Sequence, residues 1–454
     1  MKLDVLVAEI GSTTTVLSAF ASSDNGFRLI GQSESSTTVS DGDVTIGINA
    51  ALDSLKDALA VRKLDWDTLL ACSSAAGGLK MTVHGLVYDM TVKAAKEAAL
   101  GAGGVIKHVT AGKLGASDIR RILQIRPKLI LLAGGVDYGE SETALFNSGV
   151  VARLDIDVPV IFAGNCAVAS EAEAILRSSG KDVYVRENVY PRIDDLNVEP
   201  TREVIRKVFS EHIVKAPGME KIYSVVDREV IPTPAAVMIS TELLSDRFGD
   251  VMMVDIGGAT TDVDSVTDGD PEIQAKLISP EPRSKRTVEG DLGVYVNARH
   301  VVDSIGRSEL AKEFSMLDEL MASVSPFPKS DQQSAFVSRL ASHCLEMAIR
   351  RHAGRIRRVF GPTGRIDVAE GKDLTAVKMV VGTGGILARS DSAWDLLRRV
   401  RTYQRRFPQE LLPSDDVKLA IDTKYIAAAC GVLSMLDKEA AMKTLANSLE
   451  IMKP

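Results

Sequence analysis

The chain has 454 residues, of which 45% are hydrophobic and 25% are charged, and its formal net charge is −7. This composition is ordinary for a globular protein, and the length exceeds what one simple core requires, so we expect at least two domains. The negative charge provides no bulk field that would attract nucleic acid, so we expect no nucleic-acid partner.

The cysteine spacing and the hydropathy pattern exclude further classes. Cys72, Cys166, Cys344 and Cys430 lie far apart, without zinc or iron–sulfur spacing, and we interpret them as reduced, mostly buried thiols. The N-terminal run MKLDVLVAEIGS is interrupted by acidic residues, which favours a strand over a signal peptide. No stretch approaches 18 uninterrupted apolar residues, so we expect no membrane segment and a cytoplasmic location.

The beginning of the chain predicts a β-meander. Apolar runs separated by turns at Gly11–Thr14 and Asp24–Gly26 favour three antiparallel strands. An amphipathic helix, a fourth strand and a turn of small residues are expected next. The expected bounds are Leu3–Glu9, Thr15–Ala21 and Phe27–Gln32 for the meander, then Val44–Val61, Thr68–Ser73 and Ala75–Gly78.

From Thr91 onward, helical and strand patterns alternate, which predicts a parallel sheet. Gly134-Gly135 and Gly164-Asn165 follow two of the strands, at the edge where ligands bind in many parallel sheets, although these glycines could equally close tight turns. The expected elements are a helix at Asp118–Ile125 with Ser117 as its N-cap, strands at Leu129–Leu132, Val158–Phe162 and Val183–Arg186, a helix at Thr201–His212 and a strand at Ile222–Val226.

The second half of the chain begins with a helix that has Pro at its start, followed by an apolar strand. The Pro- and Ser-rich segment Ser323–Ser330 is expected to be a surface loop between two helical stretches. The expected elements are a helix at Pro234–Leu244, a strand at Val251–Asp255, helices at Val294–Met321 and Asp331–Arg351, a strand at Met379–Val381 and a last long helix at Lys424–Leu436.

Three glycine-rich turns each follow an apolar strand. They read EIGSTT at 9–14, DIGGATTD at 255–262 and GTGG at 382–385. The first two share one plan, in which an acidic residue and Ile precede Gly, small residues and hydroxyls. This weak internal repeat, separated by about half the chain, indicates two similar halves that face each other.

The composition of these turns indicates polyphosphate binding. Glycine lets the backbone approach phosphate and offers N–H groups, and Ser and Thr hydroxyls add donors. An acidic residue at the strand end cannot bind phosphate, but it can hold Mg²⁺, usually through water. The candidate metal-binding residues are Glu9 and Asp255. The candidate nucleotide-binding residues are Gly11, Ser12, Thr13, Thr14, Gly257, Gly258, Ala259, Thr260, Thr261, Gly382, Thr383, Gly384 and Gly385.

The candidate catalytic residues are Glu9, Asp255, Asp262 and Glu289. In the run EGDLG at 289–293, one carboxylate could orient an attacking water, although a plain turn would have the same composition. Asp264 and Asp268 are interpreted as residues of the next hairpin turn. The basic runs Arg350–Arg358 and Arg398–Arg406 are interpreted as solvated helix ends, although they could instead touch an acidic partner or the nucleotide phosphates.

The order of these motifs resembles the actin/Hsp70/sugar-kinase superfamily. The turns at 9–14 and 255–262 resemble its two phosphate motifs, the turn at 382–385 its adenosine motif, and the runs IPTPAAV and YIAAACGVL its two connecting helices. Ala427, Ala428 and Gly431 are small at helical spacing, as a close helix crossing requires. Glu9 is a departure, because the superfamily usually has Asp there.

This resemblance implies an α/β fold with two actin-like, ribonuclease H-like ATPase domains that flank a nucleotide cleft. The first domain would comprise residues 1–245 and 420–454, and the second would comprise residues 246–419. The chain would cross between them at the two connecting helices, and the expected mechanical output is a hinge motion driven by nucleotide.

A narrower resemblance extends over nearly the full length. The runs VAEIGSTTT, LLAGGVDYGE, FAGNCAVASE, PTPAAV, VDIGGATTDVDS, EGDLG and DLTAVKMVVGTGG look like the MutL family associated with glutamate mutase, which shares only its name with the mismatch-repair protein. Its members accompany coenzyme B12-dependent mutases of amino-acid fermentation. The resemblance implies ATP and Mg²⁺ as cofactors, ATPase activity, and mutase subunits as the partners that the chain reactivates. A homo-oligomer is left open.

Two alternatives use the same nucleotide site. A small-molecule kinase would need a dedicated base and a substrate pocket, which the sequence does not show clearly. A nucleotide-gated scaffold would bind ATP without turnover. The sequence has no DxHxxG-type cobalamin signature, so a reactivating protein of this kind need not bind cobalamin itself.

Overall fold

The computed structural model describes residues 1–75, 79–213, 216–325, 328–361 and 364–453. The chain divides into two compact units, Met1–Ile239 with Ala428–Thr444 (unit 1) and Ser240–Ala427 with Leu445–Pro454 (unit 2). The turn predicted at Ala75–Gly78 and the loop predicted at Ser323–Ser330 lie partly outside the described residues. Within the described ranges, no helix combines the length and apolar character that crossing a membrane requires.

The first sheet of unit 1 contains the predicted meander. Its three strands pair antiparallel in sequence order, a fourth strand pairs parallel to the first, and a short fifth strand pairs parallel to the fourth. The strand order is therefore β10-β4-β1-β2-β3. The strands are Lys2–Ile10 (β1), Thr14–Ser23 (β2), Gly26–Ser36 (β3), Asp65–Ser73 (β4) and Ile231–Pro232 (β10).

The predicted parallel sheet lies between β4 and β10 in the chain. Its five strands are all parallel in the order β6-β5-β7-β8-β9. This is the 2-1-3-4-5 order of flavodoxin-like doubly wound sheets. The strands are Leu79–Gly85 (β5), Gly104–Ala111 (β6), Leu129–Leu132 (β7), Val160–Phe162 (β8) and Val183–Val185 (β9).

Helices flank both sheets of unit 1, and one apolar core extends from the meander to the parallel sheet. The N-cap prediction at Ser117 is wrong, because Gly115 occupies that position and its N–H donates to the Asp118 carboxylate at 2.9 Å. The strand predicted at Ile222–Val226 is also wrong, because tight i→i+3 hydrogen bonds form a short 3₁₀ turn at Ile222–Ser224 (η4). The helices are Val44–Ala58 (α1), Lys93–Gly101 (α2), Ala116–Ile125 (α3), Glu142–Ala152 (α4), Ala169–Ser178 (α5) and Glu199–Ile213 (α6).

The main sheet of unit 2 repeats the topology of the first sheet. A meander of three antiparallel strands is followed by two parallel strands beside its first strand. Both sheets therefore have the order 3-2-1-4-5, and unit 2 adds β18 at the edge. The strands are Val251–Ile256 (β11), Thr261–Val266 (β12), Ser284–Glu289 (β13), Met379–Thr383 (β16), Lys418–Ile421 (β17) and Glu450–Ile451 (β18). The duplication confirms the predicted internal repeat and the α/β fold with two actin-like, ribonuclease H-like sheets.

Helices of unit 2 enclose a second apolar core. The helical stretch predicted at Val294–Met321 consists of three separate helices. Gly306, with φ +101°, separates the first two, and a third follows. The helices are Pro271–Gln274 (α8), Ala298–Ile305 (α9), Arg307–Glu313 (α10), Leu317–Ala322 (α11), Asp331–His352 (α12), Gly385–Arg389 (α13), Ala393–Arg398 (α14) and Val400–Arg406 (α15).

Three helices each belong partly to one unit and partly to the other, namely Thr233–Phe248 (α7), Ala427–Leu433 (α16) and Lys438–Ser448 (α17). The predicted close crossing is present, since a Cβ added to Gly431 would lie 1.9 Å from the Ala236 carbonyl oxygen. The last long helix predicted at Lys424–Leu436 is wrong in its bounds, because α16 ends at Leu433 and Asp437 caps the separate helix α17. The final residues return to unit 2, where β18 pairs with β17.

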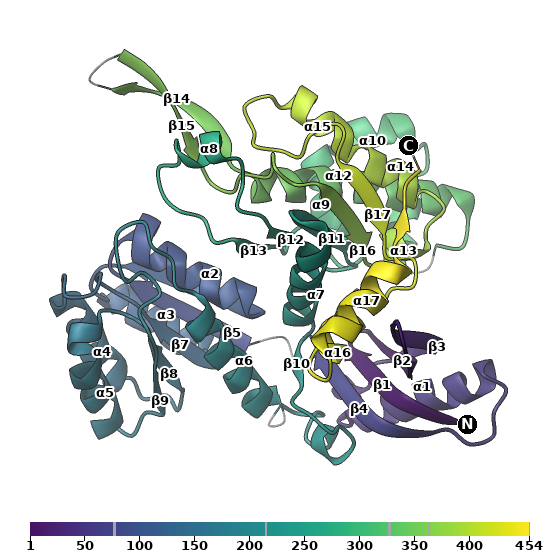
Figure 1. Cartoon of the computed structure of the whole chain (residues 1–454), viewed down its shortest axis with the longest axis horizontal. Coiled ribbons are helices and arrows are strands. Elements are labelled where there is room, and N and C mark those ends of the chain that lie inside the picture. The colour runs from purple at the N-terminus through teal and green to yellow at the C-terminus, as the bar shows by residue number, and fades with distance from the viewer. Residues whose placement is uncertain (76–78, 214–215, 326–327, 362–363, 454) are drawn as a thin grey trace. The chain divides into compact units, whose positions relative to one another are not determined.

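The chain also forms a hairpin that was not predicted. Strands Arg355–Gly361 (β14) and Gly364–Glu370 (β15) pair antiparallel and form a two-stranded sheet of their own. In Figure 1 this hairpin extends outward from unit 2 beyond α8. The basic run Arg350–Arg358 is therefore not a single helix end, because α12 ends at His352 and the remaining arginines lie in β14.

Candidate functional site

The turn between β11 and β12 is closed by a hydrogen bond and leaves little room for a side chain at position 257. The Gly257 N–H donates to the Thr260 carbonyl at 2.9 Å, and an added Cβ on Gly257 would lie 3.1 Å from that carbonyl oxygen. Gly258 is exposed, and its added Cβ would meet nothing closer than Tyr295 at 3.4 Å. A side chain at position 258 would therefore fit the protein but would cover the outer face of the turn.

The carbonyl groups of this turn point into the protein. The Gly258 carbonyl accepts hydrogen bonds from the Tyr295 and Val296 N–H groups at 2.9 and 2.7 Å, and the Asn297 amide donates to the Ala259 carbonyl at 2.6 Å. The N–H groups of residues 258–260 make no hydrogen bond with any residue that the structure describes. Consecutive free N–H groups form an anion-binding concavity, so this turn offers donors for phosphate.

The turn between β1 and β2 repeats this geometry in unit 1. The Gly11 N–H donates to the Thr14 carbonyl at 2.9 Å, and the Gly11 carbonyl accepts from the Thr37 hydroxyl at 2.9 Å. Ser12 and Thr13 are exposed, and their N–H groups have no partner within the described ranges. The predicted similarity of the two turns is thus present in their hydrogen bonds.

The GTGG turn at 382–385 contacts Asp255, the acidic residue before the turn at 257–261. Strand β16 runs parallel to β11 with Thr383 opposite Asp255. Gly384 has φ +88°, and an added Cβ would lie 2.3 Å from the Asp255 Oδ1 atom. Only glycine fits this position without displacing the carboxylate, so the GTGG turn and Asp255 form one local structure.

Carboxylates gather around Asp255 at the ends of the unit 2 strands. Burial, followed by the charge of Asp262 across the β11–β12 pair, raises the pKa of Asp255 to about 7. Arg286 opposes this shift and donates to the Asp262 carboxylate at 2.7 Å. Burial raises the pKa of Asp264 well above its usual value, with Arg286 again opposing. Asp264 lies inside β12 and is buried, so its assignment to a hairpin turn is wrong.

Asp255 is the member of this cluster that could hold a divalent cation. The described part of the chain contains no group of three or more His, Cys, Asp or Glu side chains arranged to hold a metal ion. Mg²⁺, however, usually keeps several waters and binds through one or two carboxylates together with substrate phosphates. Asp255, beside the free N–H groups of residues 258–260, provides such a sparse set of ligands.

Asp422 belongs to this cluster and was missed at the level of sequence. It follows β17, is fully buried, and accepts hydrogen bonds from the Ile426 and Ala427 N–H groups at 3.1 and 2.8 Å. The Thr383 hydroxyl donates to the same carboxylate at 3.1 Å. Burial raises the pKa of Asp422, and these donors oppose the shift. The available signal was an apolar strand that ends in Asp, the same signal that identified Asp255.

Glu289 lies at the end of β13, opposite Thr261 of β12. The Arg351 guanidinium donates to the Glu289 carboxylate at 2.6 Å and to both carboxylate oxygens of Asp291, at 2.7 and 3.0 Å. The Asn297 amide, which holds the second turn, also donates to the Gly290 carbonyl at 2.9 Å. Arg351 lies exposed in the last turn of α12, as predicted, and it also clamps the acidic turn.

The predicted residues therefore fall into two local groups. Unit 2 brings together Asp255, Asp262, the turn at 257–261 and the turn at 382–385, while unit 1 holds Glu9 and the turn at 11–14. Three of the predicted hydroxyls are directed at protein atoms. Thr260 donates to the Asp262 carboxylate at 3.0 Å, Thr261 donates to the Leu292 carbonyl at 2.7 Å, and Thr383 donates to Asp422. Ser12 and Thr13 are the exposed hydroxyls.

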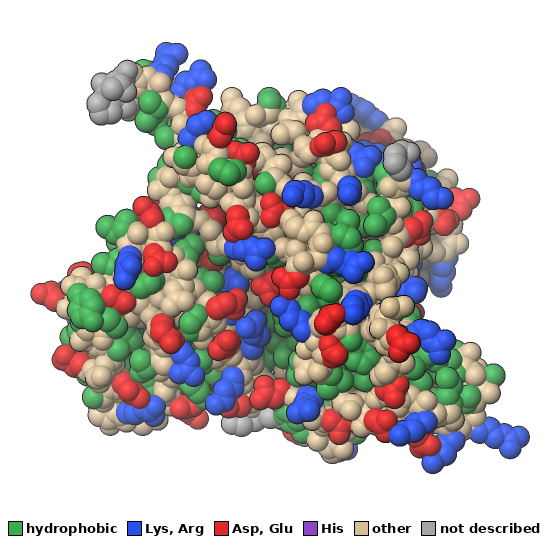
Figure 2. Space-filling view, in the orientation of Figure 1, with side chains coloured by type: hydrophobic (Ala, Val, Ile, Leu, Met, Phe, Trp, Pro, Cys, Tyr) green, Lys and Arg blue, Asp and Glu red, His purple; other side chains and the backbone are tan. Residues whose placement is uncertain are grey.

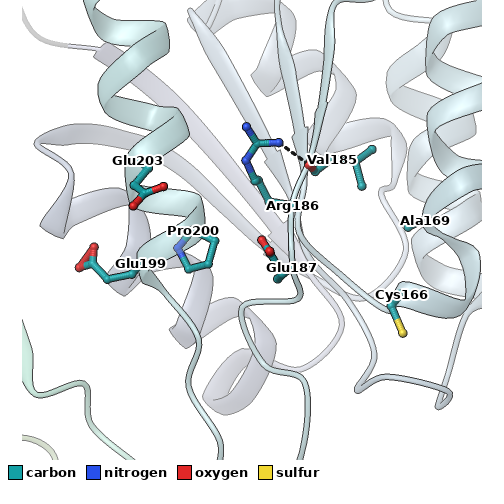
Figure 3. Close-up of a pocket in the computed structure, with 8 residues that line it drawn as sticks. All are labelled: Cys166, Ala169, Val185, Arg186, Glu187, Glu199, Pro200 and Glu203. Carbon is teal, nitrogen blue, oxygen red and sulfur yellow. Dashed lines mark hydrogen bonds between the residues drawn. The ribbon is translucent and has the colours of Figure 1, made fainter.

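A pocket of about 520 Å³ opens at the carboxyl ends of β8 and β9 in unit 1. Its walls include Cys166, Arg186 and three glutamates, Glu187, Glu199 and Glu203. Figure 3 shows the Arg186 side chain turned back to the Val185 carbonyl, to which it donates at 2.7 Å. Glu199 is paired with Arg202 and Arg206, but Glu187 and Glu203 add negative charge and the one arginine of the walls is engaged, so this pocket does not suit a nucleotide triphosphate.

The duplicated 3-2-1-4-5 sheets and the glycine turns at the ends of β1 and β11 define a protein of the actin/Hsp70/sugar-kinase fold class. A family model described as MutL protein matches residues 5–449. The chain is 36% identical over 445 residues to "Protein MutL" of Clostridium tetanomorphum, with 94% of this chain and 95% of that protein covered. The chain belongs to the MutL family, as its motifs predicted.

Solved structures resemble this chain at a lower level. A diol dehydratase-reactivating factor in nucleotide-free form is 12% identical with a TM-score of 0.37, over 96% of this chain and all of that one. Xylulose kinase from Bifidobacterium adolescentis is 13% identical with a TM-score of 0.32, over 99% of this chain and 96% of that one. At such scores, neither structure identifies a ligand or a partner of this chain.

Proposed function

We propose that this chain binds and hydrolyses Mg-ATP and uses the cycle to reactivate a coenzyme B12-dependent mutase such as glutamate mutase. ATP binding is supported by the two glycine turns, which have matching hydrogen bonds. Each turn follows a strand that has an acidic residue near its end. The second turn combines free N–H groups with a carboxylate cluster, which is the combination that a metal-bound polyphosphate requires.

The proposed roles follow the local groups. The turns at 11–14 and 257–261 bind phosphates, the turn at 382–385 binds the adenosine, and Glu9 and Asp255 hold Mg²⁺ through water. Asp262 and Glu289 are the candidates to orient an attacking water. Each is held in place by an arginine, Arg286 or Arg351, at 2.7 and 2.6 Å. The cation would supply positive charge beside the developing negative charge on phosphate.

Family membership supports the accessory role, because the MutL family is the one associated with glutamate mutase. The diol dehydratase-reactivating factor is named for the reactivation of an enzyme, but its similarity to this chain concerns the fold alone. The two actin-like domains, proposed at residues 1–245 with 420–454 and at 246–419, would change their arrangement with nucleotide. ATP can drive remodelling of a partner only if the ATP and ADP forms bind that partner with different affinities.

The test measures recovery of a mutase that has been inactivated by turnover. Glutamate mutase from the same organism, with its corrinoid damaged, is incubated with free coenzyme B12 and with or without this chain and Mg-ATP. We expect recovery only when both chain and Mg-ATP are present, and at least about a fivefold difference in mutase affinity between the ATP and ADP states. An absence of recovery, together with an affinity that is indifferent to nucleotide, would contradict the proposal. ATP hydrolysis with small acceptors in place of mutase would then separate a kinase from a scaffold.

A further inference from the structure

The β14–β15 hairpin is an arm that packs against unit 2 only at its base. The Ile356 N–H donates to the Gln409 carbonyl at 2.7 Å, and the Ala369 N–H donates to the Lys276 carbonyl at 2.8 Å. Beyond these residues, the strands pair with each other up to Gly361 opposite Gly364. We call residues 355–361 and 364–370 the arm.

The distal half of the arm has two different faces. Pairing places Phe360 opposite Arg365 on one face, with Arg358 opposite Asp367 beside them. Phe360 is 81% exposed, and the Arg365 guanidinium lies 5.3 Å from its ring centroid. Val359 and Ile366 form the apolar pair on the other face. Figure 2 shows basic, acidic and apolar side chains along the arm.

An isolated two-stranded hairpin is marginally stable in water, because neither face has a core to cover. An exposed phenylalanine at its end adds apolar surface that contributes nothing to the core of unit 2. Aromatic residues and arginine are also the residue types that dominate binding energy in protein interfaces. The composition of the arm is therefore that of a binding surface rather than that of a structural brace.

The charge of the arm differs from that of the chain. The arm carries four arginines and two acidic residues, while the chain as a whole has a net charge of −7. Arg358 pairs with Asp367, and Arg355 and Arg357 pair with Glu370. Arg365 forms no ion pair with any residue that the structure describes, so its charge is available to a partner. Two net positive charges on an acidic chain are too few for binding nucleic acid, which depends on many phosphate contacts.

We propose that the arm docks on an acidic surface of a partner protein, which receives Phe360 in an apolar pocket and pairs carboxylates with Arg365. The proposal rests on the proposed function in one respect, namely that the partner is the B12-dependent mutase. Opposite charges across the interface would accelerate encounter, and the buried phenylalanine would supply most of the affinity.

The experiment compares binding of the full chain and of its arm variants to glutamate mutase that holds cyanocobalamin. We expect Phe360→Ala to weaken binding by at least about tenfold, as a truncated interface anchor does. Arg365→Glu should also weaken binding to the mutase. The loss of affinity should be larger at low salt than at high salt, because salt screens the interaction between charges. The matched control is Ile193→Ala, which truncates an apolar side chain that is 70% exposed in unit 1. Each variant is also measured for Mg-ATP affinity and melting temperature, which should not change.

The outcomes separate the arm from the wider function. If the parent chain binds the mutase and both arm variants bind it equally well, the arm proposal is wrong while the proposed function stands. If the parent chain shows no mutase binding in any nucleotide state, both proposals are wrong. A 20-nucleotide single-stranded RNA is tested in the same way. If the RNA binds the parent chain and binds the arm variants more weakly, while mutase binding is unchanged, then the arm binds nucleic acid and the inference is overturned.

Discussion

The turns after β1 and β11 have the same hydrogen-bond geometry in different surroundings. In each, a glycine N–H closes the turn at 2.9 Å and the following N–H groups remain free. Across the meander pair, however, Glu9 faces Val16, whereas Asp255 faces Asp262. On the parallel side, Glu9 lies beside Cys72, and Asp255 lies beside Thr383.

The difference indicates how one topology can serve two purposes. Both turns present donors to an anion, and in unit 2 burial and then the charge of Asp262 raise the pKa of Asp255. A cation placed there would relieve the repulsion between Asp255 and Asp262. We therefore expect the metal to depend mainly on Asp255 and the first turn to contribute mainly phosphate contacts.

The largest expected effect comes from Asp255→Asn, which keeps the shape of the side chain and removes its charge. We expect Mg-dependent ATP affinity to fall at least about a hundredfold, or about 2.7 kcal/mol, because a metal-side carboxylate is lost. Titration calorimetry with and without Mg²⁺ measures this change. An unchanged affinity in the folded variant would remove Asp255 from the site.

Glu9 provides the matched comparison in unit 1. Glu9→Ala should lower turnover more than it lowers ATP affinity, and Glu9→Asp should be tolerated because Asp is the usual residue in the superfamily. ATP hydrolysis assays and calorimetry on the same samples separate the two quantities. If Glu9→Ala weakens Mg-ATP binding as much as Asp255→Asn does, the two turns share the metal equally and the proposed asymmetry is wrong.

A smaller effect is expected when the outer face of the second turn is covered. Gly258→Val should weaken ATP binding by about tenfold, or about 1.4 kcal/mol, since its side chain would block the approach of phosphate to the N–H groups. The fold should persist, because an added Cβ meets nothing closer than 3.4 Å. Ser12→Val tests the equivalent position of the first turn. A melting temperature that falls in Gly258→Val along with affinity would show a folding defect instead.

The smallest effect concerns stability in the absence of nucleotide. The pKa of Asp264 is raised in the folded state, so the folded state binds more protons and the free energy of unfolding falls as pH rises above the unfolded pKa of about 3.8. Asp264→Asn should therefore be more stable than the parent chain at pH 8, with a smaller advantage at pH 5. Urea unfolding at both pH values measures this difference. Asp268→Asn is the exposed control and should show no such trend.

Much of the fold could be predicted because its signals are local. The alternating strands of the meander, the apolar run Leu129–Leu132 and the glycine turns each depend on neighbouring residues. The arm could not be predicted, because its strands are exposed on both faces and so lack a periodic apolar pattern. The link between Arg351 and Glu289 joins residues 62 positions apart, and only the pairing of β12 with β13 brings Glu289 near the second turn.

The flavodoxin-like sheet of unit 1 has a consequence for the history of this chain. The chain leaves the first sheet after β4 and returns at β10, and these two strands pair directly, with Ile231 opposite Cys72. An insertion whose ends meet in this way can be acquired in one event without disturbing the host. In β7, however, Leu129 and Leu131 now belong to the core shared with the host sheet, and Ile130 and Leu132 belong to a core of their own. Removing the segment between β4 and β10 would therefore expose apolar residues of the core that the first sheet shares with it.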